Sequence, residues 1–265
     1  MEFTLALVQF KPVRKNVAQN IRDIQSLLRG IKADLIVLPE LTNSGYLYAS
    51  KESLTPYSES AAGDGQFLNA LNKLASITKG VIVSGYAELD QNQLYNSAIA
   101  ISADGILANY RKTHLFADEK LLFFPGDSGF QTFTWKNVCI GMMVCFDWIF
   151  PESVRTLALA GAQIIAHPAN LVLPYCQNAM VTRSIENKVF TITANSIGAE
   201  KLGEQKLIFT GQSQITGPKG EILYRGPKNK STVHVMSIDP EKAFDKSINP
   251  KNDLFNDRKT EIYKI

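Results

Sequence analysis

Three side chains that could carry out chemistry together, Cys145, Lys112 and Glu40, each lie at the end of a mostly apolar segment. A thiol can attack a carbonyl carbon, a carboxylate can take the thiol proton, and an ammonium can hold negative charge that develops on the carbonyl oxygen. Ligands in open α/β sheets gather at the carboxyl ends of strands, so these positions favour one shared site. The preceding segments are residues 138–144, 106–110 and 35–38.

Each of these residues also has an ordinary structural interpretation when it is taken alone. A free cysteine is more often a buried core residue than a nucleophile. Glu40 fits a solvated loop carboxylate equally well, and most lysines lie at the surface. The position of Cys145 between a strand and a helix favours the nucleophile, because a helix N-terminus lowers the pKa of a thiol. Cys139, inside a strand, and Cys176, in a loop, keep the structural interpretation.

The elements that must position these residues follow from hydrophobic periodicity, which alternates between helical and strand spacing. Helices are predicted at residues 17–31, 67–77, 151–160 and 179–188. Single strands are predicted at residues 3–9, 35–38, 81–83, 163–168, 189–195 and 232–238. Hairpins are predicted within residues 98–110, 132–145 and 209–224, each around a turn sequence.

A weak internal repeat organises these elements. Residues 33–40 parallel residues 162–169, and the hairpin at Asp104-Gly105 parallels the one at Lys219-Gly220. A duplicated unit of sheet and helices gives two similar layers that pack face to face. We therefore expect an α/β fold, a four-layer αββα sandwich, in a single domain over residues 1–265. The polar tail from about residue 240 is expected to wrap this domain or to join a partner subunit.

Composition excludes several function classes. The chain has 265 residues and a net charge of +3 from scattered Lys and Arg residues, so we expect no nucleic-acid partner. No apolar run reaches the roughly 20 residues of a membrane helix. The N-terminus reads as a strand and not as a signal peptide, so a cytoplasmic protein without a membrane partner is expected. Three cysteines argue against a disulfide framework, and the three histidines are not spaced for a metal site.

Several motifs around the three reactive residues occur in the order Glu, Lys, Cys. They are residues 38–40 with 45–46, 110–116, 141–147, 150–152 and 183–187. With these motifs the chain resembles the nitrilase superfamily of carbon–nitrogen hydrolases over nearly its whole length, which implies the αββα fold of that family. The resemblance implies that Glu40 is the general base, Lys112 the oxyanion stabiliser and Cys145 the nucleophile. It also implies that the backbone N–H of Phe146 is a second oxyanion donor.

The resemblance extends to residues around this triad. Glu119 matches a second family glutamate that orients the lysine and the substrate, although it also fits a charge on a surface loop. Tyr46, Trp148 and Asn170 are candidates for the substrate pocket, as is Phe124, and the aromatic residues among them fit the core equally well. Two further residues of the motifs, His114 and Arg183, are expected to be structural, with Arg183 paired to a carboxylate such as Glu186.

The implied activity is hydrolysis of a non-peptide carbon–nitrogen bond through a Cys145 thioester, with release of ammonia and without a metal or cofactor. The expected substrate is a small aliphatic amide or an N-carbamoyl compound, because Phe146-Asp147 follows the cysteine where many dedicated nitrilases have Trp-Glu. Three alternatives stay open: an aliphatic nitrilase that acts through a thioimidate, an ω-amidase-type metabolite repair enzyme, and an interaction protein with a dead site. The resemblance also implies a homodimer or a higher homo-oligomer.

Overall fold

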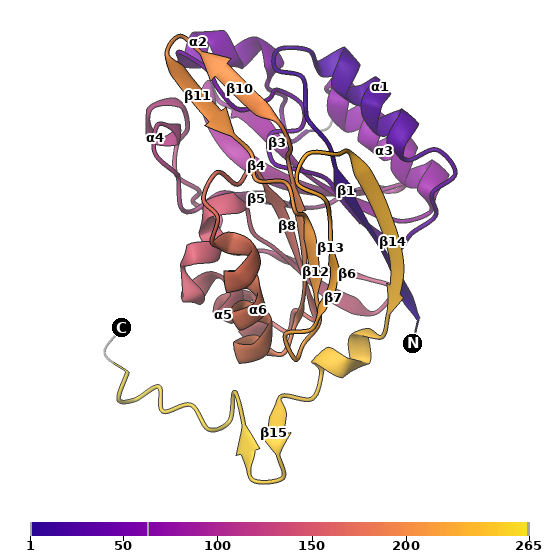
Figure 1. The fold of residues 1–265 in the computed structure, drawn as a ribbon, viewed down its shortest axis with the longest axis vertical. Helices are drawn as coiled ribbons and strands as arrows, with labels where there is room; N and C mark the ends of the chain where they lie inside the picture. Colours follow the sequence, from indigo (N-terminus) through magenta and orange to yellow (C-terminus); the bar gives the residue numbers. More distant parts are fainter. Residues whose placement is uncertain (1, 63, 264–265) are drawn as a thin grey trace.

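Two six-stranded β-sheets stack face to face in the computed structural model, which describes residues 2–62 and 64–263 (Figure 1). The first sheet has the order β14 (Thr232–Ile238), β1 (Phe3–Gln9), β2 (Leu35–Val37), β3 (Val81–Asp90), β4 (Gln93–Ser102), β5 (Gly105–Arg111). The second has the order β13 (Ile222–Arg225), β12 (Gln214–Thr216), β9 (Phe190–Asn195), β8 (Ile164–Ala169), β7 (Val138–Met142), β6 (Thr132–Trp135).

Helices form the two outer layers (Figure 1). Those on the first sheet are α1 (Val17–Leu27) and α3 (Gln66–Thr78), and those on the second are α5 (Pro151–Leu159) and α6 (Cys176–Asn187). Short helices are α2 (Lys51–Leu54), η1 (Thr55–Tyr57), α4 (Glu119–Leu122), η2 (Cys145–Ile149) and η3 (Pro240–Ala243). Two small hairpins are β10 (Ala199–Leu202) with β11 (Gln205–Ile208), and β15 (Ser247–Asn249) with β16 (Asn252–Asp253). The predicted αββα sandwich is thus confirmed.

The internal repeat is confirmed by the strand order. β2 and β8, which contain the two segments matched in the sequence, are each the middle strand of three parallel strands. The hairpins β4–β5 and β12–β13 each extend such a trio by antiparallel pairing. Parallel strands need covered faces, which explains why both middle strands are buried along their whole length and, apart from His167 in β8, apolar. The duplication therefore places equivalent strand ends at equivalent positions in the two sheets.

Successive side chains of a strand contribute to two different apolar layers, one between the sheets and one beneath the helices. In β1, Leu5 and Leu7 belong to the core cluster that joins both sheets, whereas Ala6 and Val8 pack with α1 and α3. Successive strand residues point to opposite faces, so one strand supplies both interfaces. Leu35 and other inner-face residues thereby form a continuous apolar layer between the sheets. This layer fixes the two sheets relative to one another, and with them the residues at the strand ends.

Several predicted boundaries were wrong for physical reasons. The helix expected to reach residue 31 ends at Leu27, before Gly30 in the left-handed region at φ 76°. Cys176 is not in a loop but is the buried first residue of α6. The strand expected to reach Cys145 ends at Met142, because the chain leaves the ladder ahead of the turn. The hairpin β10–β11 was not predicted at all.

The polar tail folds against the C-terminal end of α6. Lys246 Nζ donates to the backbone oxygens of Asn187 and Lys188 at 3.0 and 2.9 Å. A cation at this end of a helix satisfies carbonyls that have no partner inside the helix. The described residues include no helix that is both long and apolar enough to cross a membrane.

Candidate active site

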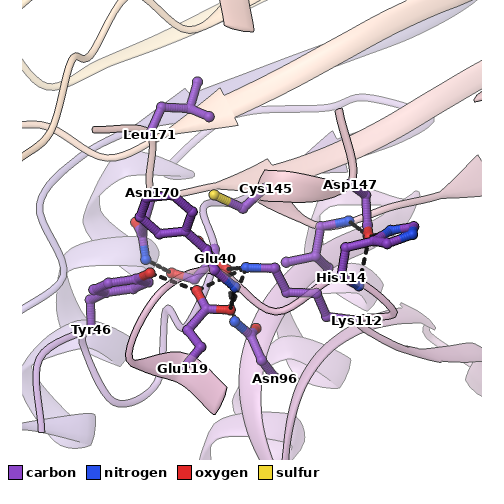
Figure 2. A network of polar contacts seen from close by, with 12 residues as sticks. Glu40, Tyr46, Asn96, Lys112, His114, Glu119, Cys145, Asp147, Asn170 and Leu171 are labelled. Atoms are coloured by element: carbon purple, nitrogen blue, oxygen red, sulfur yellow. Dashed lines mark hydrogen bonds and ion pairs between the residues drawn. The ribbon is translucent and has the colours of Figure 1, made fainter. Parts of the chain in front are cut away.

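Glu40, Lys112 and Cys145 meet between the two sheets. Glu40 follows β2, Lys112 follows β5, and Cys145 follows β7 of the second sheet, so the three come from strand ends far apart in sequence. Figure 2 shows the Cys145 thiol beside the Glu40 and Lys112 side chains. Lys112 Nζ lies 2.7 Å from Glu40 Oε1, and 2.9 and 2.8 Å from Oε1 and Oε2 of Glu119. The structure thus brings together all four residues that the sequence predicted as catalytic.

This charge cluster is almost completely removed from water. Lys112 is 1% exposed, Glu40 0% and Glu119 4%. Burial by itself lowers the pKa of Lys112, but Glu119 and Glu40 outweigh it and raise the pKa above its ordinary value. Burial raises the pKa of Glu40, and the attraction of Lys112 opposes only part of that rise. The lysine therefore keeps its positive charge, and the Glu40 carboxyl holds a proton more readily than an ordinary glutamate does.

The two oxygens of Glu40 have different surroundings. Oε1 accepts from Lys112 Nζ and, at 2.8 Å, from Asn96 Nδ2. Oε2 is buried and accepts no hydrogen bond from the described part of the chain. Buried polar atoms without a partner are rare in native proteins and call for an explanation. The backbone of Glu40 packs closely against Gly85, because a Cβ on Gly85 would lie only 2.4 Å from Glu40 Cα.

Glu119 is held from two directions besides Lys112. Its Oε1 accepts from the Tyr46 hydroxyl at 2.6 Å, and its Oε2 accepts from the Phe116 backbone N–H at 3.1 Å (Figure 2). Burial, followed by the negative charges of Glu119 and Glu40, raises the pKa of Tyr46 well above its ordinary value. The tyrosine therefore keeps its proton and acts as a donor. Glu119 is therefore a buried member of the cluster, and the alternative that it is a charge on a surface loop is wrong.

Cys145 lies in a strained turn. Its φ of 42° is in the left-handed region, which a residue with a Cβ rarely adopts. The backbone is fixed by His167, whose Nε2 lies 3.0 Å from the Cys145 carbonyl oxygen and whose Nδ1 lies 3.0 Å from Thr193 Oγ1. Burial lowers the pKa of His167 to about 4, so its ring is neutral at pH 7. Since the carbonyl can only accept, Nε2 carries the proton, and Nδ1 accepts from Thr193.

Asp147 ties this turn to the loop that carries Lys112. Its Oδ2 accepts from the Val144 backbone N–H at 2.9 Å and from the Tyr110 hydroxyl at 2.8 Å. Its Oδ1 accepts from the backbone N–H and from Nδ1 of His114, at 3.2 and 2.8 Å. His114 is thus structural, as predicted. Arg183 is too, since Nη1 lies 2.9 Å from Glu186 Oε1.

The pKa of the Cys145 thiol shifts in the direction opposite to the one that the sequence predicted. Burial, and then the negative charge of Glu40, raises the pKa of Cys145 well above its ordinary value, although Lys112 opposes the rise. The helix expected to lower this pKa is only the five-residue η2, and burial is the largest influence on the thiol. The resting residue is therefore a protonated thiol. A nearby base must remove the proton before Cys145 can attack, and the free Oε2 of Glu40 is suited to do so.

A small cavity opens beside the thiol. Its volume is about 10 Å³, roughly the room that one water molecule needs. It is lined by Cys145 and Asn170 and by six apolar or aromatic residues, Phe116, Phe146, Trp148, Leu171, Val172 and Leu173. Tyr46 is not part of this lining but belongs to the Glu119 network. Phe124 lies 38% exposed elsewhere, with its ring 6.1 Å from that of Tyr95.

The two polar atoms of the Asn170 side chain have different surroundings. Its Nδ2 donates to the Glu40 backbone oxygen at 2.9 Å. Oδ1 is buried and receives no hydrogen bond from the residues that the structure describes. An acceptor therefore remains open in the wall of the cavity beside Cys145.

Three residues of this site were not predicted as parts of it: Asn96, Asp147 and His167. The contacts of Asn96 and His167 join segments distant in sequence, so no local pattern marks their roles. Two signals were available, because His167 lies in the strand that the repeat pairs with the Glu40 strand, and Asp147 lies in the motif at residues 141–147.

The stacked-sheet fold and a buried thiol beside an ammonium and two carboxylates define a class of hydrolases. The family model for carbon-nitrogen hydrolase matches residues 4–244, and the chain belongs to this family. It is a carbon–nitrogen hydrolase, as the sequence predicted. A nitrilase of Pyrococcus abyssi is 42% identical over 262 residues, which cover 98% of each chain.

Other relatives have different substrates in their names. An N-carbamoylputrescine amidase of Solanum tuberosum is 30% identical over 285 residues, which cover 99% of this chain and 94% of the relative. Among solved structures, an amidase from Nesterenkonia sp. superposes with a TM-score of 0.78 at 24% identity and covers 98% of this chain and 94% of its own. The amidase structure shares the fold, and the names of the relatives differ in the substrate.

The raised thiol pKa leads to a test by alkylation. Replacing Glu40 by glutamine removes the negative charge that opposes the thiolate and leaves Lys112 in place, so the Glu40→Gln variant is expected to be alkylated on Cys145 at lower pH than the wild type. The measurement is the pH dependence of iodoacetamide labelling, followed by mass spectrometry of the Cys145 peptide because Cys139 and Cys176 are also free. Glu204→Gln, on an exposed turn, is the control. An unchanged or higher pH midpoint of labelling in Glu40→Gln contradicts the conclusion that the Glu40 charge raises the pKa of Cys145.

Proposed function

We propose that this protein hydrolyses small neutral amides through an acyl-thioester on Cys145. The observation that carries the proposal is the buried cluster of Lys112 with Glu40 and Glu119 beside a protonated thiol, in which Glu40 Oε2 accepts no hydrogen bond from any residue that the structure describes. Such an arrangement supplies a base, a cation and a nucleophile without a histidine. A dead site has no need to retain three buried charges, which are hard to remove from water.

The steps follow from the residues. Glu40 takes the thiol proton, and the Cys145 sulfur attacks the amide carbon. Lys112 and the backbone N–H of Phe146 hold the negative charge on the carbonyl oxygen, and one such donor contributes about 10²- to 10³-fold in kcat. Glu40 returns the proton to the leaving nitrogen, and ammonia departs from the thioester. Water then loses a proton to Glu40 and attacks the thioester, which releases the acid and restores the thiol.

The cavity supports a short and uncharged acyl group. Among the described residues that line it, none is acidic or basic, and six are apolar or aromatic. A second carboxylate on an ω-amide, or the ammonium of an N-carbamoyl diamine, has no counter-charge there, and an unpaired charge costs much free energy in an apolar site.

Two observations favour different substrate classes, an amide and a nitrile. The open Asn170 Oδ1 is suited to accept from the N–H₂ of an amide, which a nitrile does not have. The identity of 42% to a nitrilase supports the second candidate, a small nitrile. In that reaction the Cys145 sulfur adds to the nitrile carbon, and the nitrogen receives the thiol proton to give a thioimidate. Water converts the thioimidate to the same thioester with release of ammonia.

Ammonia release across a matched panel tests this proposal. We expect propionamide and butyramide to be hydrolysed with at least tenfold higher kcat/KM than succinamic acid and N-carbamoylputrescine, whose charges find no partner in the cavity. Cys145→Ala is the control for thiol-dependent turnover. Preference for a charged substrate over its neutral analogue contradicts the proposed specificity, and equal turnover by Cys145→Ala contradicts the proposed reaction.

The Asn170→Ala variant separates amide from nitrile chemistry. It removes an acceptor that only the amide can use, and a hydrogen bond of about 1–1.5 kcal/mol corresponds to a roughly tenfold loss. We expect kcat/KM for propionamide to fall about tenfold more than kcat/KM for propionitrile. The ratio between the two substrates is the readout, because the lost contact of Asn170 with Glu40 affects both alike. A constant ratio contradicts the role of Oδ1.

A further inference from the structure

The β10–β11 hairpin lies outside both sheets and packs over the loop that carries Tyr46. In Figure 1 it lies at the same end of the molecule as α2. Leu202 and Leu207 of the hairpin pack against the apolar cluster that contains Tyr46 and Leu115. The hairpin thus covers the outer side of the Glu119 network.

Glu200 is the one residue of this hairpin that points a charge inward. It is 7% exposed, and its carboxylate accepts three contacts from two backbone N–H groups. Tyr46 N lies 3.1 Å from Oε1 and 3.2 Å from Oε2, and Leu47 N lies 2.8 Å from Oε2. A carboxylate that accepts from backbone N–H groups forms stronger hydrogen bonds than a neutral acceptor does. Glu200 therefore fixes the backbone at Tyr46 and Leu47.

This contact is two side chains away from the lysine. The Tyr46 hydroxyl donates to Glu119 at 2.6 Å, and Glu119 contacts Lys112. Phe209, which follows β11, also packs edge-on against the Tyr46 ring, with centroids 6.0 Å apart and planes at 83°. Both the backbone and the ring of Tyr46 are therefore held by the hairpin and the residue after it.

The same segment also supports the wall of the cavity. The Thr210 backbone N–H donates to the Leu171 oxygen at 2.8 Å, and Leu171 lines the cavity beside Cys145. The hairpin also contacts the residue before α4, from Gln205 Nε2 to Asp118 Oδ2 at 3.1 Å, and this contact is exposed. An exposed contact of this kind contributes little to positioning.

We propose that Glu200 is a positioning residue that orients Lys112 through Tyr46 and Glu119. The inference rests on the proposed function, because it assigns Glu200 to the orientation of the oxyanion-stabilising lysine. A purely structural Glu200 would stabilise the loop and leave the turnover of the folded protein unchanged. The two possibilities differ in whether the effect of Glu200 passes through the Tyr46 hydroxyl.

A double-mutant cycle with Glu200→Ala and Tyr46→Phe tests this path. A small misplacement of a reacting group can reduce the rate about 100-fold, so we expect Glu200→Ala to lower kcat for propionamide about 10- to 100-fold with little change in KM. In the Tyr46→Phe background the same substitution is expected to reduce kcat less than threefold, because the path is already broken. Additive losses in kcat overturn the proposal.

Glu200→Gln keeps one acceptor oxygen and is expected to recover most of the lost kcat, and it serves as the milder variant if Glu200→Ala does not fold. Glu204→Ala removes a charge from the turn of the same hairpin and is the matched control with unchanged kcat. If Glu200→Ala equals Glu204→Ala in an active enzyme, the role of Glu200 is refuted and the proposed function stands.

Hydrogen exchange gives a readout that does not depend on the substrate. The Phe116 N–H donates to Glu119, so Glu200→Ala is expected to speed exchange in the peptide that contains residues 114–122, whereas Glu204→Ala leaves it unchanged. Unchanged exchange in Glu200→Ala overturns the inference even if the wild type hydrolyses no tested amide. Failure of the wild type on every amide and nitrile instead overturns the proposed function.

Discussion

The structure depends on keeping one ammonium between two carboxylates in a place without water. Lys112, Glu40 and Glu119 are all nearly inaccessible, and each would be strongly unfavourable there alone. Breaking a buried pair by removing one partner typically costs about 3–5 kcal/mol. The surrounding polar groups, Asn96 on Glu40 and Tyr46 on Glu119, complete the hydrogen bonds that the charges need. The first sheet holds Glu40 and Lys112 at the ends of β2 and β5, and α4 carries Glu119 to them.

The same burial explains how a thiol with a raised pKa can serve as a nucleophile. Burial is the largest influence on this pKa, and His167 fixes the backbone of the strained Cys145 turn. In the proposed mechanism the proton moves when the substrate binds, and Glu40, whose own pKa is raised by burial, receives it. A low-dielectric cavity strengthens the attraction between Lys112 and a developing oxyanion. Proton transfer and charge stabilisation thus both follow from the exclusion of water.

The sequence predicted the αββα sandwich, the repeat and the positions of Glu40, Lys112 and Cys145, because strand periodicity and residue type carry that information locally. Glu119 was predicted only through the family resemblance. The sequence did not predict the αL conformation of Cys145 or the direction of its pKa shift, which depend on neighbours from other strands. Asp147, Asn96 and Glu200 were missed for the same reason, since each acts on a segment far away in sequence. The β10–β11 hairpin was missed because its short strands carry little alternation and pack mainly on a loop.

The central claim is that Cys145 becomes acylated during turnover. Its most direct test is rapid acid quench of the enzyme with propionamide within the first turnovers, followed by tandem mass spectrometry of the Cys145 peptide. We predict a propionyl group on the Cys145 sulfur that appears before propionate accumulates and disappears as the substrate is consumed. Steady release of propionate with no acyl group on Cys145 at any quench time, together with activity in Cys145→Ala, would contradict the account.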